Sequence, residues 1–327
     1  MSFKKVLATC LVTALGLGSV GLNVVEASEF PGNRPITIVV PFPPGGTSDL
    51  MGRVMAKGMQ ARLGVPVMVE NKAGGGTLIG SQFVARSAPD GHTLLLAATP
   101  HAINATMYKK IPYDTKKDFY TVVRLAETPL VVAVPNNSSV KSVDDLVKEI
   151  KTKGKDIAYG SSGVGGPPHL ATELFLKQIG GTATHAPYRG SNPAVMDLIA
   201  GRTGFTFDTL YLIMSQADAG KLRPIASTGK QRHARAPNLP TLAESGYPDF
   251  EVTSWFTLAA PGGTPKEVIN KLNKAANDTL KDPEVVSFLV DNGMNITGGS
   301  AEAAQSRLLR EIDQWAEAVK ISGASVD

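Results

Sequence analysis

The chain has 327 residues, of which 43% are apolar and 19% are charged, and its formal net charge is +4. This length suggests roughly two domains of ordinary size, and the composition is that of a folded protein, which excludes a disordered or fibrous chain. The positive excess is mild and no block of Lys and Arg residues concentrates it, so no nucleic-acid partner is expected.

The first 27 residues predict a secretory signal peptide that is cut after Ala27. Lys4 and Lys5 form a positive start, and an apolar run follows at residues 6–25. An uncleaved anchor is the alternative, because a run of about 20 residues approaches membrane-spanning length. The Gly, Thr, Ser and Asn residues within the run make it a poor span, which favours cleavage.

The single cysteine, Cys10, falls inside this predicted signal. The mature chain is therefore expected to have no disulfide, no thiolate metal site and no cysteine nucleophile. An exported protein of this size without disulfides suggests a soluble protein of a bacterial periplasm.

Residues 41–49 join a predicted strand, Ile36–Val40, to a helix whose apolar residues recur at helical spacing up to residue 63. The paired glycines of this loop allow a sharp turn and a close backbone approach to a ligand. Thr47, Ser48 and Asp49 are suitable N-cap residues. The N–H groups of a first helical turn have no partners within the helix, so this turn could cradle an anion. A capped turn without a ligand is the alternative.

Two more strands follow in the first third of the chain. An apolar run at residues 65–69 leads into the glycine-rich loop 71–77 and a helix, and residues 93–99 form a third buried strand. Apolar strands that alternate with loops and helices indicate a parallel α/β sheet.

The same order of elements begins again after residue 140. The loops 161–169 and 188–193 each follow a β-type run and precede a helix, and the strand 204–208 ends in a carboxylate. A second α/β unit is the simplest explanation of this repetition.

Two long extended runs, at residues 122–135 and 251–261, flank the second unit and predict paired hinge strands. On this interpretation the chain crosses to a second domain near residue 130 and returns near residue 255. We predict a discontinuous first domain, residues 28–129 with 253–327, and a second domain, residues 130–252.

Four loops, 43–49, 71–77, 161–169 and 188–193, share one position between a strand and a helix. Ligands of open α/β sheets bind at the carboxyl ends of strands, so two such loops from each domain should surround one cleft between the domains. The loops are rich in Gly, Ser and Thr and poor in Lys. Their N–H groups and hydroxyls suit a carboxylate or another small oxyanion, bound directly or through water.

Individual side chains near these loops have alternative interpretations. Arg189 could clamp an anion or be an ordinary surface residue. Asp208 could receive an amine or a hydroxyl of the ligand, or cap the next helix. His169 could contact the ligand, although a capping or core histidine is more common. Phe42 and Trp255 could cover a ligand or belong to the core.

Signatures of common enzymes are absent from the sequence. It has no Gly-x-Ser-x-Gly, its glycine-rich segments break the dinucleotide and phosphate-loop patterns, and its five histidines form no His-Glu-x-x-His. We expect no catalytic residue, no cofactor and no metal. The alternative is an exported hydrolase or isomerase that uses Asp208 and His169 as a base–acid pair on a small carboxylate.

Several motifs together resemble the Bug family, the extracytoplasmic solute receptors of tripartite tricarboxylate transporters. They are Pro43-Pro44-Gly45-Gly46-Thr47-Ser48-Asp49, Asn71-Lys72-Ala73-Gly74-Gly75-Gly76, Tyr188-Arg189-Gly190, Asp197-Leu198-Ile199-Ala200-Gly201-Arg202, Leu239-Pro240-Thr241-Leu242-Ala243-Glu244-Ser245-Gly246, and Trp255 with Ala260-Pro261-Gly262-Gly263-Thr264-Pro265. The resemblance covers essentially the whole mature chain in order.

The resemblance implies an α/β, two-domain periplasmic binding protein of type II-like form, with two hinge strands and an interdomain ligand cleft. Such a receptor closes around a small carboxylate and delivers it to the permease subunits of the membrane transporter; a sensor for a membrane signalling partner is the alternative. It also implies that Gly45–Asp49 and Gly75–Thr77 hold one carboxylate, and that Ser161, Ser162 and the 188–190 loop approach from the other domain. Asp208 would reach the distal end of the ligand, and Arg189 stands where the family usually has Lys.

We therefore predict a monomeric receptor without catalytic residues. Its predicted ligand-binding residues are Phe42, Gly45, Gly46, Thr47, Ser48, Asp49, Gly75, Gly76, Thr77, Thr99, Ser161, Ser162, Gly163, His169, Tyr188, Arg189, Gly190, Asp208 and Trp255.

Overall fold

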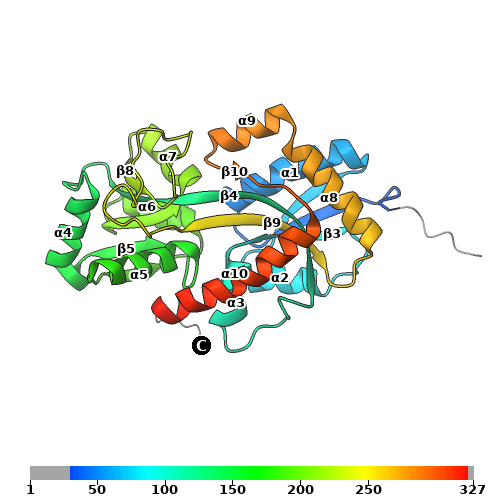
Figure 1. Ribbon diagram of the computed structural model, residues 1–327, viewed down its shortest axis with the longest axis horizontal. Helices are drawn as coiled ribbons and strands as arrows, with labels where there is room; N and C mark the ends of the chain where they lie inside the picture. The colour runs from blue at the N-terminus through cyan, green and yellow to red at the C-terminus, as the bar shows by residue number, and fades with distance from the viewer. Residues whose placement is uncertain (1–29, 323–327) are drawn as a thin grey trace, which may run out of the picture.

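Two long strands, β4 (Phe119–Pro135) and β9 (Thr253–Pro261), connect two α/β lobes in the computed structural model, which describes residues 30–322 (Figure 1). The predicted signal peptide, residues 1–27, lies outside the described range. Within that range, no helix combines the length and the apolar character needed to cross a bilayer.

The first lobe is built on strands that run parallel at its centre. β1 (Ile36–Val40) pairs in parallel with β2 (Val67–Asn71) and β3 (Thr93–Ala98), and β3 pairs antiparallel with β9. β2 begins two residues after the start of the predicted strand 65–69. Pro66 has no N–H to donate to a ladder, although its carbonyl accepts from Ile36 N, so regular pairing starts at Val67.

Helices cover both faces of this sheet because side chains alternate along each strand. Ile38 and Val40 face α1 (Thr47–Leu63) and α8 (Lys266–Leu280), whose Met55 and Leu272 share the same cluster. Val39 faces the opposite cluster, to which α2 (Leu78–Ala85), α3 (Pro100–Met107) and α10 (Ala301–Ser322) contribute. The remaining elements of this lobe are a 3-10 turn, Gly75–Thr77, α9 (Pro283–Asp291) and the short strand β10 (Asn295–Ile296).

The second lobe repeats the plan. β5 (Ala158–Ser161) pairs in parallel with β6 (Thr184–Pro187) and β7 (Phe205–Thr209), while β7 and β8 (Leu222–Ser227) flank β4 in antiparallel register. One face packs on α4 (Val143–Lys153) and α5 (Pro167–Ile179), the other on α6 (Ser191–Ile199) and α7 (Leu210–Asp218). A 3-10 turn, Gly154–Asp156, follows α4.

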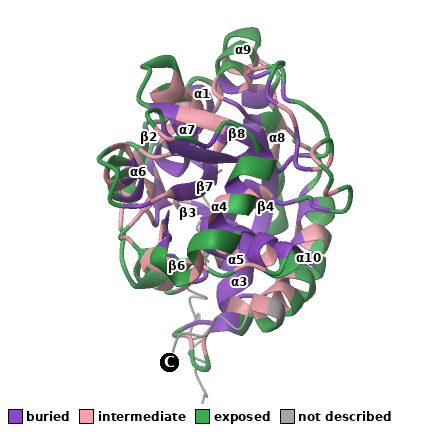
Figure 2. Ribbon diagram, turned by 90° about the vertical axis from the view of Figure 1, so that its left-hand side faces the viewer, coloured by how far each residue is buried: buried purple, intermediate pink, exposed green. Residues whose placement is uncertain are grey.

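The predicted α/β fold is confirmed, with one correction to the sheet. The strands predicted first in each unit are parallel, but the two long extended strands run antiparallel to their neighbours, so the sheet is mixed. β4 pairs with β9 from Phe119 to Pro129 and then continues between β7 and β8. Figure 2 shows the buried residues gathered on the strands, while the outward faces of α4 and α10 are exposed.

The C-terminal helix α10 contacts both lobes. Its Leu308 and Ile312 pack in the first lobe, and Trp315 packs against clusters of both lobes. Arg124 of β4 joins α10 through two hydrogen bonds of 2.9 Å to the Glu311 carboxylate, and its guanidinium lies 4.6 Å from the ring centroid of Trp255 on β9. The buried Arg124–Glu311 ion pair thus ties α10 to β4, and the contact of Arg124 with the Trp255 ring connects it to β9.

Candidate functional site

A cavity of about 90 Å³ lies between the lobes. Its first-lobe wall is the loop before α1 with the end of β3 and the start of β9, and its second-lobe wall is formed by the starts of α5 and α6 and the end of β7. The lining residues are Phe42, Pro43, Gly46, Thr47, Ser48, Ala98, Pro100, Leu130, Ser162, Pro167, Pro168, Arg189, Gly190, Ser191, Asn192, Pro193, Asp208, Thr209, Ser254 and Phe256. The two walls also touch directly, since the hydroxyls of Thr47 and Thr209 lie 2.8 Å apart.

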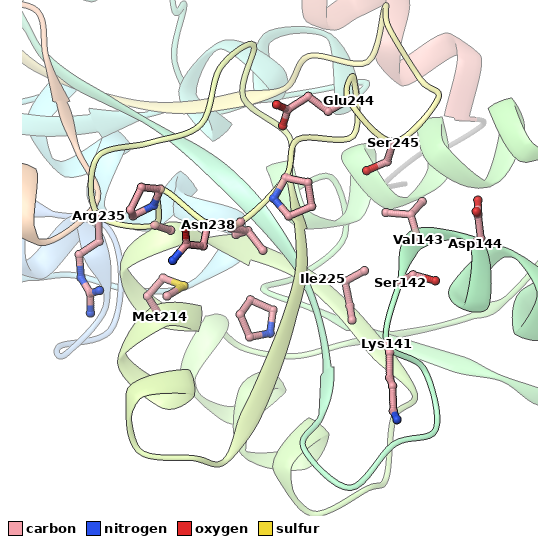
Figure 3. A pocket seen from close by; sticks show the side chains of 15 residues that line it. Lys141, Ser142, Val143, Asp144, Met214, Ile225, Arg235, Asn238, Glu244 and Ser245 are labelled. Atoms are coloured by element: carbon pink, nitrogen blue, oxygen red, sulfur yellow. The ribbon is translucent and has the colours of Figure 1, made fainter.

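A larger depression, of about 760 Å³, lies on the second lobe alone (Figure 3). Figure 3 shows Lys141, Ser142 and Asp144 at the start of α4 on one side, with Met214 of α7 and the 235–245 loop around it. Two of its charged groups are already paired, Arg235 with Asp218 and Glu244 with Arg232. Because ligand sites of this fold class lie between domains, the smaller interlobe cavity is the candidate site.

The 41–49 loop reaches the cavity with its backbone and two hydroxyls. α1 begins at Thr47, and its N-cap is Gly46, so the predicted N-cap role of Thr47, Ser48 and Asp49 is wrong. These residues form the first helical turn because the extended backbone of Gly46, with φ −91° and ψ 176°, already ends the loop. Thr47 and Ser48 line the cavity.

Asp49 is turned away from the cavity and fastens the loop. Its carboxylate accepts hydrogen bonds from Gly45 N (3.0 Å), Arg53 Nε (2.9 Å) and Asn71 Nδ2 (2.9 Å). Burial by itself would raise the pKa of this carboxyl, but the hydrogen bonds outweigh burial and hold the pKa below its usual value. Asp49 therefore remains ionised as a positioning group for the loop.

Gly45 and Gly46 differ in whether their positions would accept a side chain. Gly45 has φ +86°, which favours glycine, and a Cβ there would lie 3.3 Å from Asn192 Nδ2 of the second lobe. A Cβ at Gly46 would meet no atom within 4 Å, because the cavity lies beside it.

The 71–77 loop does not line this cavity. Gly76 O and Thr77 Oγ1 accept hydrogen bonds from Asn104 Nδ2 at 2.8 and 3.1 Å, and Gly75 O accepts from the Tyr108 hydroxyl. These bonds hold Gly75, Gly76 and Thr77 against α3 rather than at the cavity wall.

In the second lobe, Ser162, Arg189 and Gly190 line the cavity, as the loop positions predict. Arg189 is exposed at the rim, and within residues 30–322 it makes no hydrogen bond or ion pair. Ser161, Gly163 and His169 are outside the lining: Ser161 Oγ bonds to His185 Nε2 and accepts from Gly163 N, and His169 Nδ1 accepts from Gly165 N. The Tyr188 hydroxyl donates to Asp197 at 2.7 Å, which directs it away from the cavity.

Among residues 30–322, Asp208 is the one acidic side chain in the lining. It is fully buried, and its Oδ1 accepts from Thr209 N at 2.7 Å. Its Oδ2 has no hydrogen-bond partner among the described residues. Burial raises the pKa of this carboxyl to about 6, against the opposing effect of the nearby Ser191 hydroxyl and of the hydrogen bonds that Thr209 donates to Oδ1. A buried acceptor without a partner is costly, so this oxygen would gain from a donor in the cavity.

On β9 the cavity is lined by the two neighbours of Trp255 rather than by Trp255 itself. Side chains alternate along a strand, and Ser254 and Phe256 line the cavity whereas Trp255 faces Arg124 on the other side. Thr99, also outside the lining, accepts a hydrogen bond from Trp255 N at 2.9 Å. Alternation along this strand was the signal that could have identified Ser254 and Phe256, once one side chain was known to face the core.

Other lining residues were missed by sequence reasoning. Ser191, Asn192 and Pro193 belong to a loop that was predicted to face the cleft, but Thr209 and Leu130 had no such signal. The alternative acid–base pair also fails to assemble, since no hydrogen bond or ring contact joins Asp208 to His169 in the part of the chain described.

Two α/β lobes, two connecting strands and a cavity between the lobes with a few polar groups in its lining define a two-domain binding protein of the periplasmic type. The chain belongs to the family described as "Tripartite tricarboxylate transporter family receptor", whose model matches residues 51–323. This family includes the Bug proteins, so the resemblance seen in the sequence is confirmed. Its members are periplasmic solute-binding receptors.

Similar proteins agree with this assignment over nearly the whole chain. Protein BugT of Bordetella pertussis (strain Tohama I) is 34% identical over 329 residues, which covers 100% of each chain. The structure of R. palustris Rpa4515 with adipate is 34% identical, with a TM-score of 0.87 over 91% of this chain and 99% of that one. MatC from Rhodopseudomonas palustris with bound malate is 28% identical, with a TM-score of 0.82 over 88% of this chain and 99% of that one.

Proposed function

We propose that this protein captures a small carboxylate in the interlobe cavity and delivers it, in the periplasm, to the permease subunits of a tripartite tricarboxylate-type transporter. The observation that carries the proposal is the lining of the cavity. The first turns of α1 and α6 meet there, with the hydroxyls of Ser48 and Ser162 and the unpaired Arg189 at the rim. Helix N-termini, hydroxyls and an arginine are the groups that bind a carboxylate.

The carboxylate would lie at the α1 and α6 starts, and its other end would face Asp208. Arg189 is the only cationic side chain in the lining of this cavity within residues 30–322. A ligand with a hydroxyl or amino donor near its distal end would satisfy Asp208 Oδ2, which otherwise lacks a partner. The similar structures that hold adipate and malate support a ligand of this size class.

Capture would proceed by closure of the lobes about β4 and β9, with domains of residues 28–129 plus 253–327 and 130–252. This division is supported by the course of β4, which leaves the first sheet after Pro129 and enters the second at Leu130. Binding favours the closed form only to the extent that the ligand contacts both lobes, as the lining residues allow.

The receptor would carry out no chemistry on its ligand, would act as a monomer, and would require no cofactor. Within residues 30–322, Asp208 accepts from Thr209 and His169 accepts from Gly165, and no hydrogen bond joins the two as an acid–base pair. Recovery of the bound compound unchanged after long incubation would support this part of the proposal; a chemically altered compound would contradict it.

A thermal-shift panel tests the proposal directly. Mature protein, denatured and refolded to remove any ligand carried through purification, is screened against malate, adipate, tricarboxylates, amino acids and aromatic acids. A ligand at 100 times its Kd stabilises the folded state by about 2.7 kcal/mol, which should raise Tm by roughly 4–5 °C for a chain of this length. If no acid in the panel moves Tm, and mass spectrometry finds no acid released from the native protein, the proposed function is wrong.

The affinity should depend on pH through Asp208. Since the pKa of this carboxyl is about 6, it is neutral below that pH and a charged acceptor above it. For a ligand that donates a hydroxyl or ammonium hydrogen, affinity should therefore rise about tenfold from pH 5 to pH 7.5, because hydrogen bonds to charged groups are stronger. Calorimetric titration of wild-type protein and Asp208→Asn checks this, and the variant should lose this rise and keep only the change that comes from ionisation of the ligand's own carboxyl groups. Tighter binding at low pH would instead indicate a ligand carboxyl that shares a proton with Asp208.

A further inference from the structure

Two stacked histidine rings stand directly behind the 161–166 loop of the second lobe. His169 lies in the first turn of α5, and His185 lies on β6. Their ring centroids are 4.0 Å apart, with planes inclined by 9°, and Tyr159 of β5 stacks on His185 at 4.8 Å. Neither histidine lines the cavity. We call His169 and His185 the histidine pair.

Polar groups of the 161–166 loop make hydrogen bonds to the histidine pair. His185 Nε2 lies 2.6 Å from Ser161 Oγ, which in turn accepts from Gly163 N at 3.2 Å. Gly165 N donates to His169 Nδ1 at 3.0 Å. Ser162, the cavity-lining residue, thus stands in a loop whose hydrogen bonds on both sides lead to a histidine ring.

The same loop is hydrogen-bonded to the segment after β6 that contains Arg189. Tyr188 N donates to Ser161 O at 3.0 Å, and Gly190 N donates to Ser162 O at 3.2 Å. A shift of the 161–166 loop would therefore move the backbone on both sides of Arg189.

Both rings of the histidine pair are uncharged at neutral pH. His169 Nδ1 can accept from Gly165 N only when it carries no proton. Burial lowers the pKa of His169 to about 4 and that of His185 to about 3, the second also because His169 is close. Charged imidazoles would repel at this stacking distance and would lose the acceptor, so the geometry is fixed across the neutral pH range.

We propose that His169 and His185 are positioning residues for ligand binding, which set the places of Ser162 and Arg189 without touching the ligand. The proposal rests on the proposed function, since it concerns the same cavity. It assigns to the pair a role different from the ligand contact that the sequence suggested for His169.

The experiment separates the hydrogen bonds from the stacking. His169→Phe and His185→Phe keep an aromatic ring but remove the bonding nitrogen. His169→Asn and His185→Gln lose the ring but offer an amide group near the place of Nδ1 or Nε2. His92→Phe is the matched control, because His92 bonds to Pro35 O in the first lobe and does not line the cavity.

Two measurements are made on each variant. The first needs no ligand: the amide signals of Gly163 and Gly165 in the free protein should shift, and their hydrogens should exchange faster, in the Phe variants. The second is the Kd for malate or adipate, whichever the wild-type protein binds more tightly. It should weaken about tenfold in the Phe variants, recover at least in part in His169→Asn and His185→Gln, and stay unchanged in His92→Phe.

Several outcomes would overturn the proposal. Unchanged glycine amides in both Phe variants would contradict the bonding scheme even if no acid binds, so this result is independent of the proposed function. Altered amides with unchanged Kd would show that the loop does not set the ligand contacts. If one Phe variant fails to fold, the other still decides, because each histidine makes its own hydrogen bond to the loop.

Discussion

Replacing Gly46 with phenylalanine should weaken carboxylate binding by at least about 100-fold, which corresponds to about 2.7 kcal/mol. Gly46 lines the cavity, its φ of −91° is open to any residue, and a Cβ there meets no atom within 4 Å. The new ring would therefore occupy ligand space without straining the backbone. Because Gly46 caps α1 through no side-chain bond, the free energy of unfolding should change by only about 1 kcal/mol.

Gly46→Ala is the matched control, since a methyl group leaves most of the cavity open and should retain binding within about tenfold. Kd is measured by calorimetry with a panel acid, and stability by denaturant unfolding. Unchanged affinity in Gly46→Phe would mean that the ligand binds elsewhere. A loss of folding, in contrast, would show that the loop tolerates no side chain, contrary to its geometry.

Glu311→Ala should be the most destabilising of the simple substitutions considered. The Arg124 side chain is 4% exposed, and both of its terminal nitrogens donate to Glu311. Removing the carboxylate leaves a buried guanidinium with only partial compensation from Glu127, at 3.3 Å, and from the Trp255 ring. Breaking such a pair costs about 3–5 kcal/mol, and among the described residues α10 would be held to β4 only by the Arg307–Glu127 pair and the Thr121–Gln305 hydrogen bond besides its apolar contacts.

Denaturant unfolding of three variants tests this expectation. The double variant Arg124→Met/Glu311→Leu should be less destabilised than Glu311→Ala, because it leaves no unpaired buried charge. Glu149→Ala, which breaks an exposed pair with Lys153 one helical turn away, should cost no more than about 0.5 kcal/mol. Equal losses of unfolding free energy in Glu311→Ala and Glu149→Ala would show that burial does not increase the contribution of the Arg124–Glu311 pair to stability.

Local patterns were sufficient for the arrangement of the elements. The apolar runs and the glycine-rich loops between them predicted strands, helices and the α/β class because burial and turn geometry act over a few residues. The loops at 43–49 and 188–193 were placed at the cavity for the same reason, since the carboxyl ends of parallel strands share one edge of a sheet.

The side chains within those loops could not be assigned in the same way. Ser and Asp in a glycine-rich loop can face a ligand or fasten the loop, and sequence alone does not distinguish the two. Ser48 lines the cavity while Asp49, the next residue, bonds to Gly45, Arg53 and Asn71. Likewise His169 accepts a hydrogen bond from Gly165 N and stacks on His185, which lies 16 residues further along the chain on another element.

The sequence by itself determined the class of fold, the two connecting strands and the family, because these depend on periodicity and on motifs read along the chain. Only the tertiary structure decided which groups share the cavity. The pairing of β9 with β4 turns Ser254 and Phe256 inward and Trp255 toward Arg124, and the meeting of the lobes brings Thr47 to Thr209. Such choices depend on register and on packing between segments far apart in the chain, and no local pattern encodes them.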